Sequence, residues 1–97
     1  MEPEIIFKQD GKVITKIDFS VVPIELPKII DIQVENIGNV DLEDIEFITK
    51  DQQLKVIEYP QVLRKNSEGI LKIKYTPDTL AKKGLDTSIV VAGKYRV

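Results

Sequence analysis

The feature of this sequence that most constrains its fold is the alternation of apolar and polar residues from Asp18 to Pro77, interrupted by turn-forming residues at short intervals. In the clearest run, residues 28–35, isoleucine and valine alternate with acidic and amide side chains. The run stops at residues 36–39, where two asparagines and a glycine favour a tight turn. A period of two places one face of a strand on a core and the other in water. The stretch therefore predicts a sandwich of two sheets.

Seven strands are predicted along the chain. Their expected bounds are residues 5–7, 12–19, 28–35, 42–48, 54–59, 69–75 and 86–97. In the second strand, alternation directs Val13, Ile17 and Phe19 towards the core. An Asp-Gly pair that begins at Asp10 predicts a hairpin turn before this strand. The only helix that the pattern favours is a short one at residues 79–85.

The number of strands is informative in a chain of this length. Ninety-seven residues supply one hydrophobic core but not two, which makes residues 1–97 a single domain. Seven short strands in about 100 residues are typical of an immunoglobulin-like β-sandwich. The sequence therefore predicts an all-β fold of this kind, with about seven antiparallel strands.

Three motifs resemble one family of such sandwiches. They are the segment Asp18–Val22, the strand that ends in an Asn-x-Gly turn at Val34–Asn39, and the alternating strand that ends in proline at Leu71–Pro77. In this order they are similar to the cytoplasmic immunoglobulin-like modules of the abnormal-spindle and hydin type, which are relatives of the major sperm protein. Ser20 departs from the family, which tends to have glycine at this point. The resemblance implies a module that binds other proteins and catalyses no reaction.

The residue types that are missing exclude several classes of function. The chain has no cysteine and no histidine, so it lacks the usual zinc ligands, a thiol nucleophile and the histidine of a serine-hydrolase triad. Its 14 basic and 16 acidic residues are scattered, without the basic stripe of a nucleic-acid-binding protein. No run approaches the ~20 apolar residues of a membrane span, and the acidic N-terminus is unlike a signal peptide. We therefore expect a protein that is cytoplasmic at synthesis and binds neither nucleic acid nor membrane.

Candidate chemical groups are few. Asp41, Glu43, Asp44 and Glu46 form the strongest candidate cluster, and calcium is bound by several carboxylate oxygens brought close together. Their spacing does not match the calcium-binding loop of an EF-hand, and the exposed face of a strand is the favoured explanation. No serine lies in a nucleophile elbow. We predict no metal site, no cofactor and no catalytic residue, and hence that the protein is not an enzyme.

Sheet edges offer a more physical route to a function, because an unpaired edge can accept a strand from another protein. Ile5, Ile6 and Phe7 form an apolar N-terminal strand without proline, which would invite such pairing. The prolines that bracket residues 24–26 would block pairing in that second edge-like segment. We therefore predict that the N-terminal arm binds a partner.

The C-terminal segment offers a second candidate. Tyr95 lies between two cations, Lys94 and Arg96, where an aromatic ring could dock onto a partner. A final strand that completes one sheet is an equal alternative. Tyr95 and Arg96 join the N-terminal arm as predicted partner-binding residues. The expected partners are proteins, either the subunits of an assembly or other copies of this chain.

These inferences converge on a structural protein whose function is protein–protein interaction within a larger assembly. A capsid decoration or tail accessory protein of a virus or phage would fit, and would become part of the virion. A subunit or domain of a cellular scaffold is the alternative. A carbohydrate-binding sandwich is less favoured, because the chain has no tryptophan and only six aromatic residues, several of which the core requires.

Overall fold

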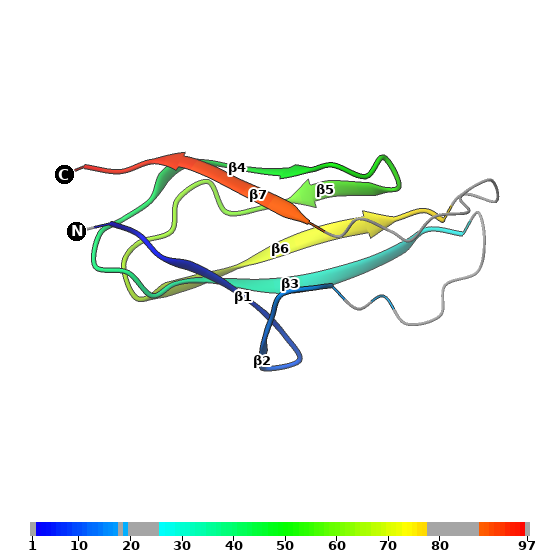
Figure 1. Cartoon of the computed structure of the whole chain (residues 1–97), viewed down its shortest axis with the longest axis horizontal. Coiled ribbons are helices and arrows are strands. Elements are labelled where there is room, and N and C mark those ends of the chain that lie inside the picture. Colours follow the sequence, from blue (N-terminus) through cyan, green and yellow to red (C-terminus); the bar gives the residue numbers. More distant parts are fainter. Residues whose placement is uncertain (1, 18, 20–25, 78–87, 97) are drawn as a thin grey trace.

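The computed structural model describes residues 2–17, 19, 26–77 and 88–96. In these ranges the chain forms seven β-strands and no helix, as predicted for an all-β fold (Figure 1). The strands are β1 (Ile5–Gln9), β2 (Lys12–Ile14), β3 (Lys28–Asn36), β4 (Glu43–Thr49), β5 (Leu54–Glu58), β6 (Ser67–Tyr75) and β7 (Ile89–Lys94). All neighbouring strands are antiparallel. The described residues form an immunoglobulin-like β-sandwich of seven antiparallel strands.

The strands are divided unequally between two sheets. The larger sheet has the order β2-β1-β3-β6-β5, and the smaller sheet consists of β4 and β7. In a constant-type immunoglobulin sandwich the two sheets contain strands A-B-E-D and C-F-G. By chain order and pairing, β1, β3, β6 and β5 take the places of A, B, E and D, and β4 and β7 take those of C and F. β2 is an addition beside A, and within the described residues no strand takes the place of G.

The core is built from the inward faces of both sheets. Its buried apolar residues are Phe19, Ile32, Val34, Leu42, Ile45, Phe47, Leu54, Leu63, Leu71 and Ile73. The pairing of β3 with β6 places Ile32 opposite Leu71, and neither side chain has exposed surface. Ile70, the residue before Leu71, is exposed on the outer face. The alternation predicted for these two strands is thus confirmed.

The second predicted strand differs from the observed one. β2 ends at Ile14, well before residue 19. Val13, which was expected to face inward, is 63% exposed, whereas Ile14 is half-buried and packs against the core. The cause is the register of the hairpin, which places Ile14 opposite Phe7 on the core face. Ile17 and Phe19 do pack in the core, as predicted.

Some sequence predictions fall outside the described residues. They are the helix at residues 79–85, most of the motif at Asp18–Val22, and the edge segment around Pro23. In the part of the chain that is described, there is no helix with the length and apolar character needed to cross a membrane.

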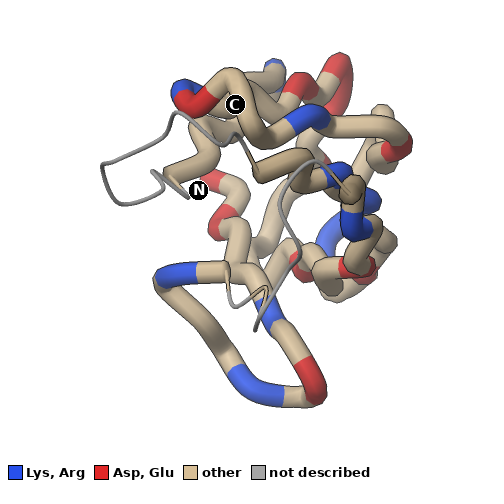
Figure 2. The backbone as a smooth tube through the Cα atoms, turned by 90° about the vertical axis from the view of Figure 1, so that its right-hand side faces the viewer, with Lys and Arg blue, Asp and Glu red and all other residues tan. Residues whose placement is uncertain are grey.

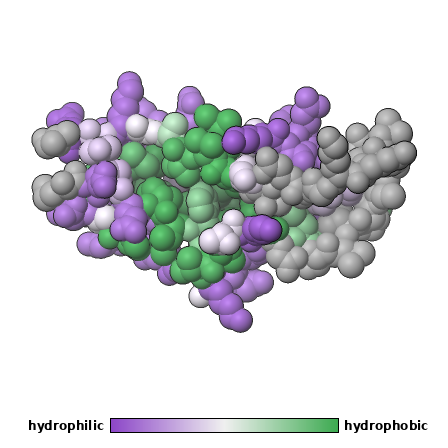
Figure 3. Space-filling model, in the orientation of Figure 1, coloured by the Kyte–Doolittle hydropathy of each residue, from purple (hydrophilic) through white to green (hydrophobic). Residues whose placement is uncertain are grey.

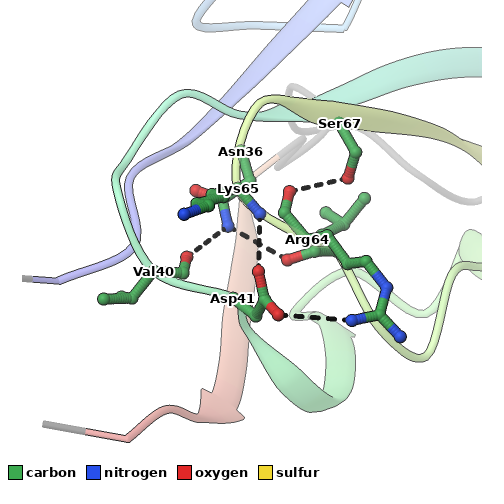
Figure 4. A network of polar contacts seen from close by, with 7 residues as sticks. Asn36, Val40, Asp41, Arg64, Lys65 and Ser67 are labelled. Carbon is green, nitrogen blue, oxygen red and sulfur yellow. Dashed lines mark hydrogen bonds and ion pairs between the residues drawn. The ribbon is translucent and has the colours of Figure 1, made fainter.

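A buried asparagine ties several loops together at one end of the sandwich (Figure 4). Asn36, the last residue of β3, has no exposed surface. Its Nδ2 donates hydrogen bonds to the carbonyl oxygens of Val40, at 2.9 Å, and Leu63, at 3.0 Å. Its Oδ1 accepts hydrogen bonds from the backbone nitrogens of Gly38, at 3.0 Å, and Glu4, at 3.3 Å. One fully satisfied amide therefore joins the N-terminal segment, the β3–β4 loop and the β5–β6 connection.

Replacing Gly38 by alanine is expected to lower the free energy of unfolding by about 1–3 kcal/mol. A Cβ atom at this position would lie 2.5 Å from the backbone nitrogen of Glu4 and 2.6 Å from the backbone oxygen of Glu2. The N-terminal segment would have to move, although a 2.8 Å hydrogen bond from the Ile37 nitrogen to the Glu4 oxygen holds it in place. Urea unfolding measures the change, with Asn39→Ala at the exposed next residue as the control. Equal stability of the two variants would contradict the close approach.

Candidate partner-binding site

The sandwich is closed along one edge and open along the other. At the closed edge, β4 lies next to β5, which follows it after the short connection 50–53. At the opposite edge, β7 neighbours only β4, and no described strand of the larger sheet comes within backbone contact of it. In Figure 1, β7 is drawn in the upper layer and β1 in the lower one. Among the described strands, none joins β7 to the β1–β2 hairpin.

An apolar hollow of about 290 Å³ lies at this open edge. The residues that line it are Phe7, Ile14, Thr15, Lys16, Ile17 and Ile89. The four apolar residues among them are half-buried and pack against the core. Figure 3 shows apolar surface gathered in the middle of this face of the molecule. The hollow suits apolar side chains of a partner, because its lining is mainly hydrocarbon.

β1 contains three of the five predicted partner-binding residues, and the structure places much of this strand inside the sheet. Ile5 and Ile6 pair with β3, and Phe7 pairs with both β3 and β2. Ile5 and Phe7 pack against the core, where the Phe7 ring meets the Phe47 ring edge-to-face at a centroid distance of 6.3 Å. The expectation that this arm is a sheet edge is thus wrong for Phe7. The apolar side chains of β1 serve the core, and Phe7 also lines the hollow.

The other two predicted residues, Tyr95 and Arg96, follow β7 and are exposed. Arg96 borders a second, more polar depression of about 270 Å³, together with residues of the β3–β4 loop such as Asp41. This depression and the hollow lie at different ends of β7, because Ile89 begins the strand and Arg96 follows its end. The five predicted residues therefore do not form one site.

The acidic cluster at residues 41–46 has structural roles. Asp41 accepts hydrogen bonds from the backbone nitrogen of Lys65, at 2.9 Å, and from the guanidinium group of Arg64, at 3.4 Å (Figure 4). Asp44, with a φ of 50°, lies in a β-bulge that begins at Glu43. Among the described residues, no three potential metal ligands converge. Asp41 thus holds a loop in place, and Asp44 adopts the left-handed backbone conformation of the bulge.

Basic residues lie beside the open edge. Lys16 lines the hollow, and Lys94 ends β7. Lys8 is different, because its ammonium group is paired with the Glu35 carboxylate at 2.7 Å. The hydrogen bond and the charge of Glu35 raise the pKa of Lys8 above its ordinary value. Figure 2 shows basic and acidic positions along the backbone of the β1–β2 hairpin, whose sequence contains Lys8 and Lys12 beside Asp10. The hollow at the open edge is thus apolar, with Lys16 as the one charged residue in its lining.

Three apolar residues of the hollow, Ile14, Ile17 and Ile89, are not among the predicted partner-binding residues. Alternation marks such residues as parts of strands, but their partial exposure depends on the smaller sheet having only two strands within the described residues. The number of strands is the sequence property that points to these residues. Once residues 12–14 are assigned to a hairpin with β1, six described strands remain for an arrangement that needs seven, so one edge of the core stays uncovered by them. Comparisons of this chain with protein-family models, with curated proteins and with solved structures found no match.

Proposed function

We propose that this protein is a non-enzymatic module that binds another protein within a larger assembly. The observation that carries the proposal is the open edge between β7 and β1, where core residues remain half-covered around an apolar hollow. Apolar surface that a small domain leaves uncovered is typical of an interaction site. The sequence resemblance to abnormal-spindle and hydin modules supports the same function.

Two kinds of assembly fit this proposal. On a virus or phage particle, the protein would be synthesised in the cytoplasm and then incorporated as a capsid decoration or tail accessory protein. In a cell, it would be a subunit or domain of a scaffold. Both require a small sandwich that offers a protein-binding surface and catalyses no reaction. The acidic sequence pI of about 5.1 argues against nucleic acid as the ligand in either assembly.

A carbohydrate-binding function has less support. Sugar rings stack on exposed aromatic faces, and most aromatic rings of this protein are engaged with one another. The pairs are Phe7 with Phe47, Phe19 with Tyr75, and Phe47 with Tyr59. In the described part of the chain, Tyr95 alone has no ring contact and is 43% exposed, while Tyr59 is 40% exposed but packs edge-to-face on Phe47. A single free tyrosine ring is a poor platform for a sugar.

Cross-linking followed by reconstitution tests the proposed function. The tagged protein is cross-linked in the cells that produce it, and each captured candidate is then purified and mixed with the untagged protein. We expect one candidate to form a stoichiometric complex by size-exclusion chromatography, with a Kd of about micromolar or tighter. A titration against a glycan panel serves as the comparison. The proposal fails when no purified protein forms a complex or when only a glycan binds.

A further inference from the structure

The four strands at the margins of the two sheets differ in their protection against pairing with another strand. Natural sheets protect their edges with short strands, charges and bulges. β2 has only three residues. β5 carries a bulge between Val56 and Glu58, and β4 carries one between Glu43 and Glu46. β4 also lies beside β5. Three of the four margins are therefore protected.

β7 lacks these protections. Its residues from Ile89 to Gly93 carry no charge and include no proline, and the bulge in its pairing with β4 lies in β4. In an antiparallel strand, alternate backbone N–H and C=O groups point away from the neighbouring strand. No described strand pairs with β7 on the side away from β4. β7 thus presents an edge that can accept one more strand.

The open edge coincides with a position of the sandwich at which no described residue forms a strand. β7 takes the place of strand F, which pairs with strand G in a complete sandwich. The apolar hollow lies at this same edge, between Ile89 of β7 and residues Phe7, Ile14 and Ile17 of the hairpin side. We propose that an extended segment of a partner protein adds to β7 as a third strand, with alternate apolar side chains covering the hollow. The inference rests on the proposed function and specifies how the partner binds.

Charge indicates the chemistry of the outward-facing side chains of this segment. Lys16 lines the hollow, and no acidic residue is among the residues that line it, whereas Lys94 lies at the other end of β7 and opposite Glu43 of β4. An incoming strand with an acidic residue beside Lys16, at a position between its apolar ones, complements the charge at the hollow. A second copy of β7 would bring Lys94, its only charged residue, to this edge. The occupant is therefore an acidic, alternating segment of another protein rather than a second β7.

Short synthetic peptides test the proposal on the intact protein. The probe is a peptide in which valine and glutamate alternate. One control has the same composition with all valines together, and another has lysine in place of glutamate. We expect the alternating acidic peptide to bind at least about tenfold more tightly than either control, as measured by calorimetry. It should also slow hydrogen exchange of the backbone amides of β7 at alternate residues.

A matched pair of variants tests whether the peptide binds at the hollow. Ile14→Glu puts a carboxylate in the hollow, and Val13→Glu makes the same change at the adjacent residue, which points away from the core. We expect Ile14→Glu to weaken binding of the acidic peptide by at least about tenfold, and Val13→Glu to change it less than about twofold. Lys16→Glu should shift the preference from the acidic towards the basic peptide. Hydrogen exchange of core amides checks that each variant is folded.

Several results would overturn the proposal. They are the absence of peptide binding at millimolar concentration, equal binding by Ile14→Glu and Val13→Glu, and protection at β2 or β5 in place of β7. A dimer in light scattering whose β7 amides are already protected would show that a second copy occupies the edge. A purified assembly partner that binds Ile14→Glu as well as wild type would refute strand addition but leave the proposed function intact. If no partner protein is found but the peptide binds at β7, the proposed function would be refuted, whereas the ability of β7 to accept a strand would stand.

Discussion

Replacing Asn36 by aspartate is expected to lower the free energy of unfolding by about 3 kcal/mol at neutral pH. The two side chains have nearly the same shape, but a carboxylate donates no hydrogen bond. The carbonyl oxygens of Val40 and Leu63 would lose their donor and face a buried charge. The bonds that Oδ1 accepts from Glu4 and Gly38 can persist, so the change isolates the donor half of the network. Urea unfolding at pH 7 measures the loss.

Asn39→Asp is the matched control, because it makes the same change in the same loop at an exposed residue. We expect its effect to stay within about 0.5 kcal/mol. Burial raises the pKa of an introduced carboxyl group at position 36 above its unfolded value of about 3.9. The folded state then holds its proton more tightly, so the deficit grows as the pH rises above about 4 and shrinks as the pH falls towards it. A deficit that is independent of pH, or equal in both variants, would contradict a buried charge.

The core strands were predictable because alternation is a local property. Ile32 and Leu71 lie on buried faces wherever their strands sit in the sheet, so no knowledge of neighbours is needed. The inward face of residues 12–14 is a different case, because it depends on pairing with β1. Asp10 and Gly11 form a two-residue turn with positive φ at both positions, which is typical of a tight hairpin. Counting outward from that turn places Ile14 opposite the core-facing Phe7. The position of the Asp-Gly pair is therefore enough to predict the correct register of the hairpin.

The candidate site was less predictable because it depends on contacts between distant parts of the chain. The hollow joins Phe7 to Ile89, and it stays open because the smaller sheet has only two described strands. Asn36 shows the same limitation. The asparagine-rich turn was predicted from local preference, but its first residue is buried because Glu4 and Leu63 supply hydrogen-bonding partners from other parts of the chain. Local pattern predicted the strands but not where the loops and edges meet.

Replacing Phe47 by alanine is expected to lower the free energy of unfolding by about 3–5 kcal/mol. Phe47 is the only aromatic residue in the smaller sheet and is 7% exposed. Its ring meets Phe7 at a centroid distance of 6.3 Å and Tyr59 at 5.8 Å, both edge-to-face. Within the described residues that sheet has two strands, and its only other side chains in or against the core are those of Ile45, Ile89 and Val91. Urea unfolding measures the loss, with the exposed neighbour Ile48→Ala as the control at less than about 1 kcal/mol.

A double-mutant cycle isolates the contact between the two sheets. A small domain has only about 5–15 kcal/mol of stability, so leucine replacements keep the variants folded while removing the rings. Phe7→Leu and Phe47→Leu should show a coupling of about 0.5–1.5 kcal/mol, as expected for an edge-to-face pair. A coupling near zero would mean that the sheets cohere without this pair, through the rest of the core and the closed edge where β4 meets β5. In that case the sandwich could open at β7 at little cost, and a bound strand would contribute stability there as well as recognition.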